Sequence, residues 1–330
     1  MDISARTRIG TWIAAASIAC GALGLYEAAL ASCRVVPSVT DDKELWCSAR
    51  QRASNNPRIL ALCGASRIQV GFSIDEARRV ADDLEVVQLA IDGTNGVATF
   101  RDLANDDSFK GTVLFSVLPA VFSHRVWDDQ APWVARRKSS WTHNDDVNRR
   151  WRSALQERFS VLAPEADISR VAMRFIRHGE FPEQHTVFRG DRFRTIDFSE
   201  LPYESYSAFR LERDRRSITS APRGAEYEQW IRDVDAVDEL TKKILLRGGN
   251  VVIYHDHLSG EYRRVYENAY PRSKFWDVIV KRSSARCIDA MSIPEIAALE
   301  CPDGSHIDAS DAPIMTRALL RSLREHNQLP

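Results

Sequence analysis

The feature that most constrains the fold is a short apolar segment, residues 59–63, which ends at Gly64. It is continuously hydrophobic and has the usual length of a strand, which is typical of a strand buried in a parallel sheet. Ser73 and Glu76 have the spacing of a helix capping box, so a helix is expected shortly after the strand. The order strand, loop, helix predicts an α/β fold, with Ser66 in the loop at the carboxyl edge of the sheet.

Further segments continue this pattern along the chain. Residues 86–91, 111–117 and 250–254 have the apolar composition of buried strands. Residues 226–246 have apolar side chains spaced for one face of a helix, and residues 313–323 predict a final amphipathic helix. The alternation of strands and helices predicts a mostly parallel sheet.

A motif near the C-terminus, Asp303-Gly304-Ser305-His306, complements the serine. A serine hydroxyl is a weak nucleophile until an imidazole removes its proton, and the imidazole needs a carboxylate to fix its tautomer. We therefore predict that Ser66 is the nucleophile, His306 the general base and Asp303 the orienting carboxylate. Each motif alone is also typical of a surface turn. Their joint order, with the serine after the first strand and Asp-x-x-His before the last helix, favours the catalytic interpretation.

With these motifs the chain resembles the SGNH (GDSL-like) hydrolase superfamily, which has a Gly-x-Ser block on its first strand and an Asp-x-x-His block near its end. It more closely resembles membrane-anchored bacterial SGNH-like proteins of cell-surface polysaccharide systems, through residues 64–71 and 301–306. The resemblance covers about residues 57–123 and 240–325. It implies a three-layer αβα sandwich with a mostly parallel sheet, of the SGNH or flavodoxin-like kind.

The resemblance also implies an oxyanion hole, made by the N–H of the nucleophile, a Gly after the second strand and an Asn after the third. Ser66 supplies the first donor, and Gly93 or Gly96 can supply the second. The third strand runs into Leu118-Pro119 without a Gly-x-Asn. Asn95 is the remaining candidate, although Asn also suits a tight turn. Because each missing donor slows acyl transfer strongly, this departure counts against efficient hydrolysis.

The N-terminus predicts a membrane anchor. Residues 9–26 are uncharged and mostly apolar, and Arg6 and Arg8 precede them. The length is close to that of a bilayer core, and the arginines favour a cytoplasmic N-terminus. We expect a single-pass protein of a bacterial inner membrane with an extracytoplasmic catalytic domain. A signal peptide cleaved after Ala31, or a lipobox that ends at Cys33, would also export the domain.

On this basis we divide the chain into an anchor (1–35), a linker (36–56) and an SGNH-like domain (57–330) with an insertion at about 124–223. The insertion is rich in Arg, Trp and Phe. Aromatic faces beside charged groups suit sugar rings or anionic polymers, although large aromatic side chains more often pack a core.

Composition excludes some partners. The chain has 45 basic and 46 acidic residues, a net charge of −1, so no global field would attract nucleic acid. Cys33 with Cys47 and Cys287 with Cys301 are the cysteine pairs nearest in sequence, but spacing does not determine disulfide connectivity.

His255 and His257 follow the predicted strand 250–254 and share one face if the strand continues. Two imidazoles fall short of the three protein ligands of a catalytic zinc, so we expect no metal and no cofactor. We expect His255, His257 and Arg67 to contact substrate instead, because all three lie at the sheet edge beside Ser66.

Three functions are therefore open. The first is an exported serine esterase or O-acyltransferase acting on acyl (acetyl) groups of a glycan. The second is a non-catalytic protein on an SGNH scaffold that binds or assembles surface polysaccharide. The third is a metal-dependent phosphoesterase that uses His255 and His257. The missing Asn counts against the first, and the intact Ser66, Asp303 and His306 count against the second.

Overall fold

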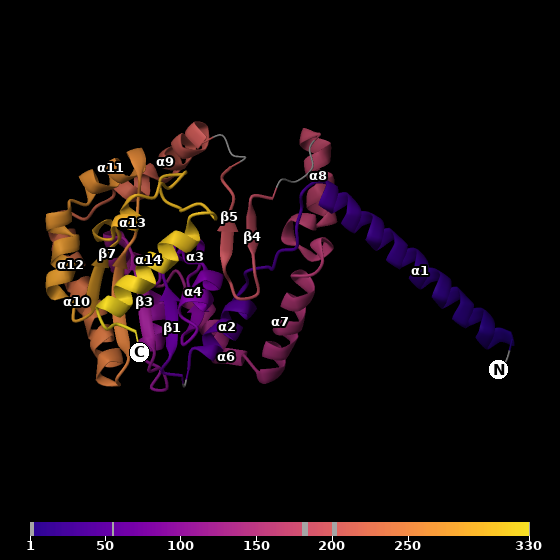
Figure 1. Cartoon of the computed structure of the whole chain (residues 1–330), viewed down its shortest axis with the longest axis horizontal. Helices are drawn as coiled ribbons and strands as arrows, with labels where there is room; N and C mark the ends of the chain where they lie inside the picture. The colour runs from indigo at the N-terminus through magenta and orange to yellow at the C-terminus, as the bar shows by residue number, and fades with distance from the viewer. Residues whose placement is uncertain (1–2, 55, 180–183, 200–202, 330) are drawn as a thin grey trace. The chain divides into compact units, whose positions relative to one another are not determined.

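The computed structural model describes residues 3–54, 56–179, 184–199 and 203–329 (Figure 1). It is a mostly helical α/β structure with a five-stranded parallel sheet and an apolar N-terminal helix. The chain forms two compact units. Unit 1 comprises residues 1–40 and 150–190, and unit 2 comprises residues 41–149 and 191–330.

The sheet lies in unit 2 and contains every strand predicted from the sequence. Its strands run in the order β2 (Glu85–Gln88), β1 (Ile59–Cys63), β3 (Thr112–Val117), β6 (Asn250–His255) and β7 (Arg286–Asp289). All four neighbouring pairs are parallel. The carboxyl ends of the strands therefore meet at one edge, which is the edge where Ser66 follows β1. Strand β7 was not predicted.

The second strand is shorter than predicted, because β2 ends at Gln88 and the prediction extended to residue 91. The chain nevertheless stays beside β1 beyond this point. The N–H of Leu89 donates to the carbonyl of Leu62, and that of Ile91 donates to the carbonyl of Gly64. This contact holds the loop after β2 close to the loop that carries Ser66.

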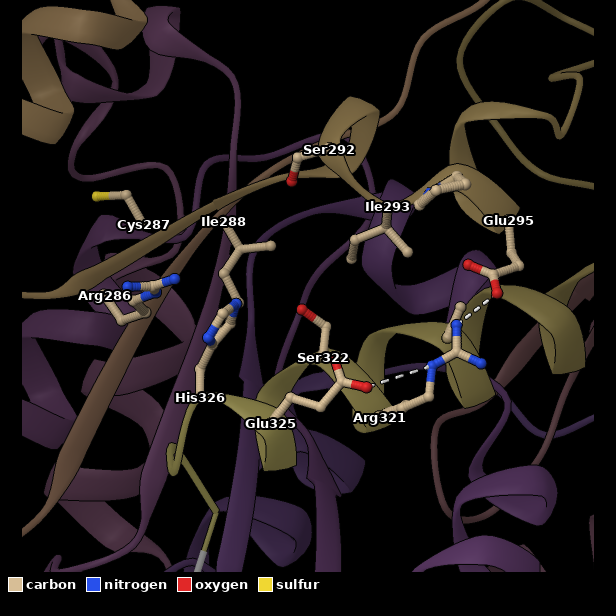
Figure 2. A pocket seen from close by; sticks show the side chains of 12 residues that line it. Arg286, Cys287, Ile288, Ser292, Ile293, Glu295, Arg321, Ser322, Glu325 and His326 are labelled. Atoms are coloured by element: carbon tan, nitrogen blue, oxygen red, sulfur yellow. Dashed lines mark hydrogen bonds and ion pairs between the residues drawn. The ribbon is translucent and has the colours of Figure 1, made fainter.

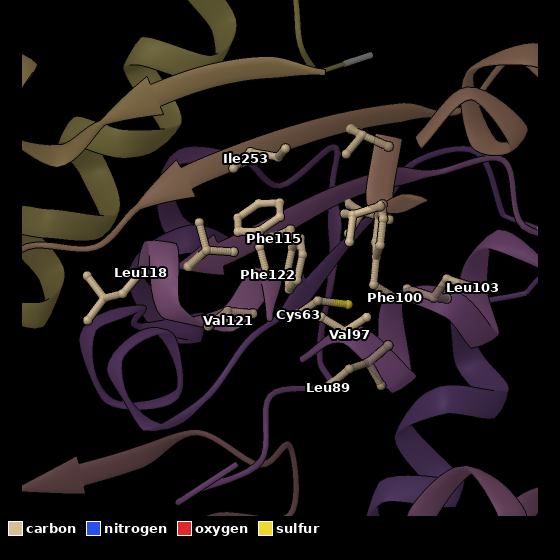
Figure 3. Packing of buried hydrophobic residues seen from close by; sticks show 14 of the residues in the cluster. Cys63, Leu89, Val97, Phe100, Leu103, Phe115, Leu118, Val121, Phe122 and Ile253 are labelled. Carbon is tan, nitrogen blue, oxygen red and sulfur yellow. The ribbon is translucent and has the colours of Figure 1, made fainter. Parts of the chain in front are cut away.

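Side chains of β1 alternate between two hydrophobic clusters, as expected for a strand buried on both faces. Cys63 belongs to the first cluster, which includes residues of α5 (Val97–Ala104) and α10 (Ala225–Leu246). Figure 3 shows part of this cluster, in which the rings of Phe100 and Phe115 stack with centroids 4.9 Å apart. Burial of such rings is a main source of stability in a domain of this size.

The second cluster lies against the other face of the sheet. It joins Leu60 and Leu62 to residues of α4 (Ile74–Val80) and α14 (Ala312–Glu325). The predicted final helix is thus present, and it extends slightly at both ends. The helix predicted over residues 226–246 is also present, as α10.

Helix α4 begins where the capping residues predict. The Oγ of Ser73 accepts the N–H of Glu76 at 3.3 Å. The reciprocal half of the capping box is replaced, because the N–H of Ser73 donates to Oγ1 of Thr316 at 2.7 Å. The Glu76 carboxylate instead pairs with Arg79 and Arg317. The cap therefore also joins α4 to α14.

The predicted linker 36–56 is not a linker. It contains α2 (Lys43–Arg52), whose Trp46 is fully buried in the first hydrophobic cluster. The fully buried Arg50 pairs with Asp102 of α5 at 2.8 Å. Removing one member of a buried ion pair typically costs about 3–5 kcal/mol, so α2 is an integral part of unit 2.

The predicted insertion 124–223 is not one body either. Its residues 150–190 belong to unit 1, and the remainder belongs to unit 2. Trp127, Trp133 and Trp141 pack against the first hydrophobic cluster, which is the packing role considered for these residues. Trp151, in contrast, is exposed.

The N-terminal helix α1 (Ile3–Ser32) is longer than the predicted apolar stretch. Residues 8–32 are long and apolar enough to span a bilayer, and most of their side chains are exposed. The acidic Glu27 has a structural partner within unit 1, because its carboxylate accepts the N–H groups of Ser160 and Val161 at 2.7 and 2.8 Å.

All six cysteines lie within the described residues, and none forms a disulfide there.

The remaining elements complete the two units. The other elements are α3 (Ser66–Gly71), η1 (Pro119–Phe122), η2 (His124–Val126), α6 (Ala131–Ser140), α7 (His143–Gln156), η3 (Ser160–Leu162), η4 (Pro164–Ala166), α8 (Ile168–His178), β4 (Thr186–Phe188), β5 (Arg194–Ile196), α9 (Tyr203–Thr219), α11 (Gly260–Ala269), η5 (Arg272–Lys274), α12 (Trp276–Arg282), η6 (Ala290–Ser292) and α13 (Pro294–Ala297).

Candidate active site

Ser66 is the first residue of α3 and lies just beyond the carboxyl end of β1. The turn that places it there requires a glycine. Gly64 has φ +148°, and a Cβ at this position would lie 2.9 Å from the carbonyl oxygen of Ser116 on β3. The close approach of the two strands therefore fixes the start of the loop, and Ser66 is largely buried at its end.

The loop before α14 holds the second motif in a defined conformation. Oδ1 of Asp303 accepts the backbone N–H groups of Ser305 and His306, at 2.9 and 2.7 Å. Gly304 has φ +81°, and a Cβ there would clash with the Cβ of Tyr262. The Asp-Gly-Ser-His sequence thus forms a tight turn, as the turn interpretation also required, and this turn aims the histidine.

The structure brings the three predicted triad residues together. The Nδ1 of His306 lies 2.7 Å from Oδ2 of Asp303, and its Nε2 lies 2.7 Å from the Oγ of Ser66. Their exposed fractions are 7% for Ser66, 2% for His306 and 1% for Asp303. The carboxylate favours the tautomer with the proton on Nδ1, which leaves Nε2 free to accept the serine proton.

Electrostatics keep the histidine in the neutral form that a general base needs. Burial lowers the pKa of His306, and the positive charges of Arg210 and Arg67 act in the same direction, while Asp303 opposes them. Burial alone would raise the pKa of Asp303. The hydrogen bond and charge of His306, with the charge of Arg210, instead hold the Asp303 pKa well below its usual range.

Arg210 on α9 is a site residue that the sequence did not indicate. Its Nη1 lies 3.3 Å from Oδ2 of Asp303, and its Nε donates to Asp214 at 2.8 Å. Arg210 therefore contacts Oδ2 of Asp303, which is the same oxygen that faces His306. No local motif marks this arginine, because it lies about ninety residues before Asp303 in the chain.

We expect Arg210→Gln to move the acid limb of the pH profile of kcat/KM to higher pH. In a serine triad, activity requires a neutral histidine and is lost as the pH falls through the histidine pKa. Removing the positive charge of Arg210 raises that pKa, so the loss begins at higher pH. Arg210→Lys keeps the positive charge, so the acid limb should stay at nearly the same pH as in wild type. An unchanged limb, or a shift to lower pH, in Arg210→Gln would contradict this assignment.

The triad opens onto a cavity of about 740 Å³, which is within the size range of small-molecule sites. Ser66 and Arg67 lie on its wall. The rest of the lining comes from residues 93–95 after β2, residues 118–126 after β3, the second half of α9, the first half of α10, and Tyr262, Tyr266 and Tyr270 of α11 and its end. Parts of the predicted insertion thus contribute to the cavity, but none of Trp127, Trp133, Trp141 and Trp151 lines it.

The predicted oxyanion residues have different surroundings. Gly93 and Asn95 line the cavity with Ser66, whereas Gly96 does not. A Cβ on Gly96 would lie 2.8 Å from the backbone nitrogen of Gly64, so Gly96 permits close packing of the two loops. The side-chain amide of Asn95 donates to Asp129 at 2.7 Å. The Asn95 amide is thus engaged with Asp129, and the N–H groups of Ser66 and Gly93 on the cavity wall remain predicted oxyanion donors.

Gln130 is a second residue that sequence reasoning missed. Its side chain is fully buried, and its Nε2 donates to the carbonyl of Gly64 at 3.0 Å and to Oγ1 of Thr94 at 2.9 Å. Its Oε1 accepts the hydroxyl of Thr99. Gln130 thus joins the loop that carries the serine to the loop after β2. We assign it a positioning role.

His255 and His257 are not among the residues that line the cavity. The ring of His255 stacks on Trp276 with centroids 4.6 Å apart, and its Nδ1 lies 3.4 Å from Oδ1 of Asp289. The Nε2 of His257 is hydrogen-bonded to the carbonyl of Leu299 at 2.8 Å. Burial lowers the His257 pKa. These contacts give no support to the predicted substrate-binding roles, and only Arg67 of that predicted group lines the cavity.

A second, smaller cavity of about 200 Å³ lies beside the edge strand β7 (Figure 2). Its wall includes the ion pair of Glu295 and Arg321. It shares no lining residue with the larger cavity. Within the described ranges, no group of three or more His, Cys, Asp or Glu side chains is arranged to hold a metal ion.

Ser66 on the wall of the larger cavity is therefore backed by a base that can take its proton and by a carboxylate that orients the base. Such an arrangement can support acyl transfer through a covalent serine ester. No family model matches the chain, and no curated protein matches it.

Proposed function

We propose that the protein is an exported serine esterase or O-acyltransferase that acts on acyl groups, such as acetyl, of a glycan. The single observation that carries the proposal is the hydrogen-bonded series from Ser66 through His306 to Asp303, which opens onto the large cavity. A chance cluster of polar residues would not be expected to have its serine, imidazole and carboxylate in this order with these tautomer-fixing contacts.

The proposed reaction has two halves. In the first, His306 takes the proton of Ser66 as Oγ attacks the ester carbonyl carbon, and the negative oxygen is stabilised by the N–H groups of Ser66 and Gly93. The tetrahedral intermediate then expels the alcohol, which receives the proton from His306, and an acyl-serine remains. In the second half, His306 takes a proton from water or a sugar hydroxyl, whose oxygen attacks the acyl carbon. The second tetrahedral intermediate expels the Oγ of Ser66, which receives the proton from His306, and the free acid or the acylated sugar is released.

The fold supports the proposal that the chain has an SGNH-like scaffold. Hydrophobic clusters line both faces of the parallel sheet, as in a three-layer αβα sandwich. The nucleophile follows the first strand, and the histidine precedes the last helix, which is the order that the resemblance implies. The departure is at the end of β3, where Leu118 lines the cavity in place of the side-chain donor of the superfamily.

Membrane attachment fits a polymeric substrate outside the cytoplasm. Helix α1 is apolar over enough length to cross a bilayer, and Arg8 precedes its most apolar part. We propose an inner-membrane anchor with the cavity on the extracytoplasmic side, and a cleaved signal or lipoprotein as the alternative. Anchoring would hold the cavity near surface polysaccharide during synthesis or export.

The second candidate is a non-catalytic glycan-binding or assembly protein, and the lack of a Gly-x-Asn directly after β3 favours it. The two candidates differ in the reactivity of Ser66. A fluorophosphonate probe should label the wild-type protein at Ser66 and should not label Ser66→Ala. Acetate release from an acetyl ester, measured with and without an oligosaccharide acceptor, then separates hydrolysis from transfer. Absence of both labelling and Ser66-dependent acetyl chemistry would leave the scaffold role.

A further inference from the structure

Arg67 lines the cavity and forms no ion pair with any described residue. The residue follows the nucleophile directly in the sequence, and both line the cavity. Its Nε is buried and has no hydrogen-bond partner among the described residues. No carboxylate of the described chain lies within ion-pair distance of its guanidinium. The residue as a whole is partly exposed, on the wall of the cavity. A cation partly withdrawn from water is stabilised when a ligand supplies the opposite charge.

The neighbouring acidic groups are committed elsewhere. Asp303 is bound by His306 and Arg210. Asp256 is close enough to interact electrostatically with Arg67, but its Oδ1 accepts the hydroxyl of Ser116 at 2.5 Å. Burial raises the pKa of Asp256 to about 6, although the charge of Arg67 opposes this shift. These carboxylates influence Arg67 at a distance. Tyr262 has a side-chain hydrogen bond with Arg67, while the Arg67 Nε donor has no partner among the described residues.

The other arginines of the cavity are paired or exposed. Arg210 and Arg213 share Asp214, and Arg125 pairs with Glu226. Arg232 is exposed to solvent at the wall of the cavity. Arg67 is therefore the one partly buried arginine among the described lining residues that lacks an ion pair. A planar guanidinium binds a carboxylate through two parallel hydrogen bonds, which suits a ligand group of one negative charge.

We propose that Arg67 forms a subsite for a carboxylate on the substrate, which makes the substrate an acylated sugar acid, such as a hexuronic acid residue of a polysaccharide. This proposal rests on the proposed function, because the subsite adjoins the serine ester chemistry. A phosphate monoester carries nearly two charges at neutral pH, so it matches the single unpaired cation less well. Tyr262, whose side chain interacts with Arg67, lines the same region.

The kinetic test compares O-acetylated oligomers of a hexuronic acid with the same oligomers after methyl esterification of the carboxyl groups. Wild type should prefer the charged oligomers by about 30-fold or more in kcat/KM, on the pH plateau and at constant salt. Arg67→Gln should lose this preference by slowing the charged substrate alone, and Arg67→Lys should retain part of it. Equal use of both substrates by wild type, or an equal loss on both in Arg67→Gln, would overturn the proposal.

A binding measurement keeps this result separate from the proposed function. Calorimetry on Ser66→Ala, with and without Arg67→Gln, measures affinity for the same two ligands and for a sugar phosphate. Tighter binding of the uronate that depends on Arg67 supports the subsite even if no turnover depends on Ser66. Equal affinity for the charged and esterified oligomers, or tighter binding of the sugar phosphate, overturns it.

Discussion

Ser66→Ala is expected to lower kcat for ester cleavage by about a million-fold, the loss typical when the nucleophile of a serine triad is removed. The reason is that Ser66 is the only hydroxyl among the described residues that contacts the Nε2 of His306, with its Oγ at 2.7 Å. Acetate release from a soluble acetyl ester by the purified protein measures the effect. Binding of substrate should change little, because alanine removes a single atom from the cavity wall.

The matched control is Ser305→Ala. Ser305 is also buried and lies in the triad loop, but its Oγ has no hydrogen-bond partner in the described chain. Its replacement should leave kcat within a few-fold of wild type. If Ser66→Ala retains a substantial part of the wild-type rate, the serine is not the nucleophile and the enzymatic proposal fails.

The central strands were predictable because burial on both faces makes their sequences almost entirely apolar. Strands β1, β3 and β6 begin and end within about a residue of the predicted bounds. The edge strand β7 was missed because only Cys287 and Ile288 of its four residues are apolar. Helix α2 was missed for a related reason. Its sequence is mostly polar, and its burial depends on the distant partner Asp102.

The candidate site likewise contains residues that were predictable from the sequence and residues that were not. Ser66 and the Asp303–His306 turn were predictable because local motifs carry them. Arg210 and Gln130 were not, because they reach the site from segments far away in sequence. His255 lies at the correct edge of the sheet, but its ring packs on Trp276. The position of a residue at the end of a strand thus predicted that it lies at the edge of the sheet. Which of these side chains enters the cavity depends on tertiary packing.

Asp303→Asn is expected to lower kcat by about ten-thousand-fold, the loss typical of this change in a serine triad. The Asn oxygen can still accept the N–H groups of Ser305 and His306, so the turn should survive. Its NH₂ group would then face Nδ1 of His306 and donate to it. This contact favours the tautomer with the proton on Nε2, which cannot accept the proton of Ser66.

Asp308→Asn is the control for that substitution. Asp308 lies in the same loop, and its carboxylate likewise accepts backbone N–H groups, those of Ser310 and Phe198. Its replacement should alter thermal stability about as much as Asp303→Asn does and leave kcat near wild type. The two variants should therefore differ in kcat but have similar unfolding temperatures. Equal rates in the two variants would show that Asp303 only shapes the loop, because a carboxylate that fixes the base cannot be replaced by an amide without loss of catalysis.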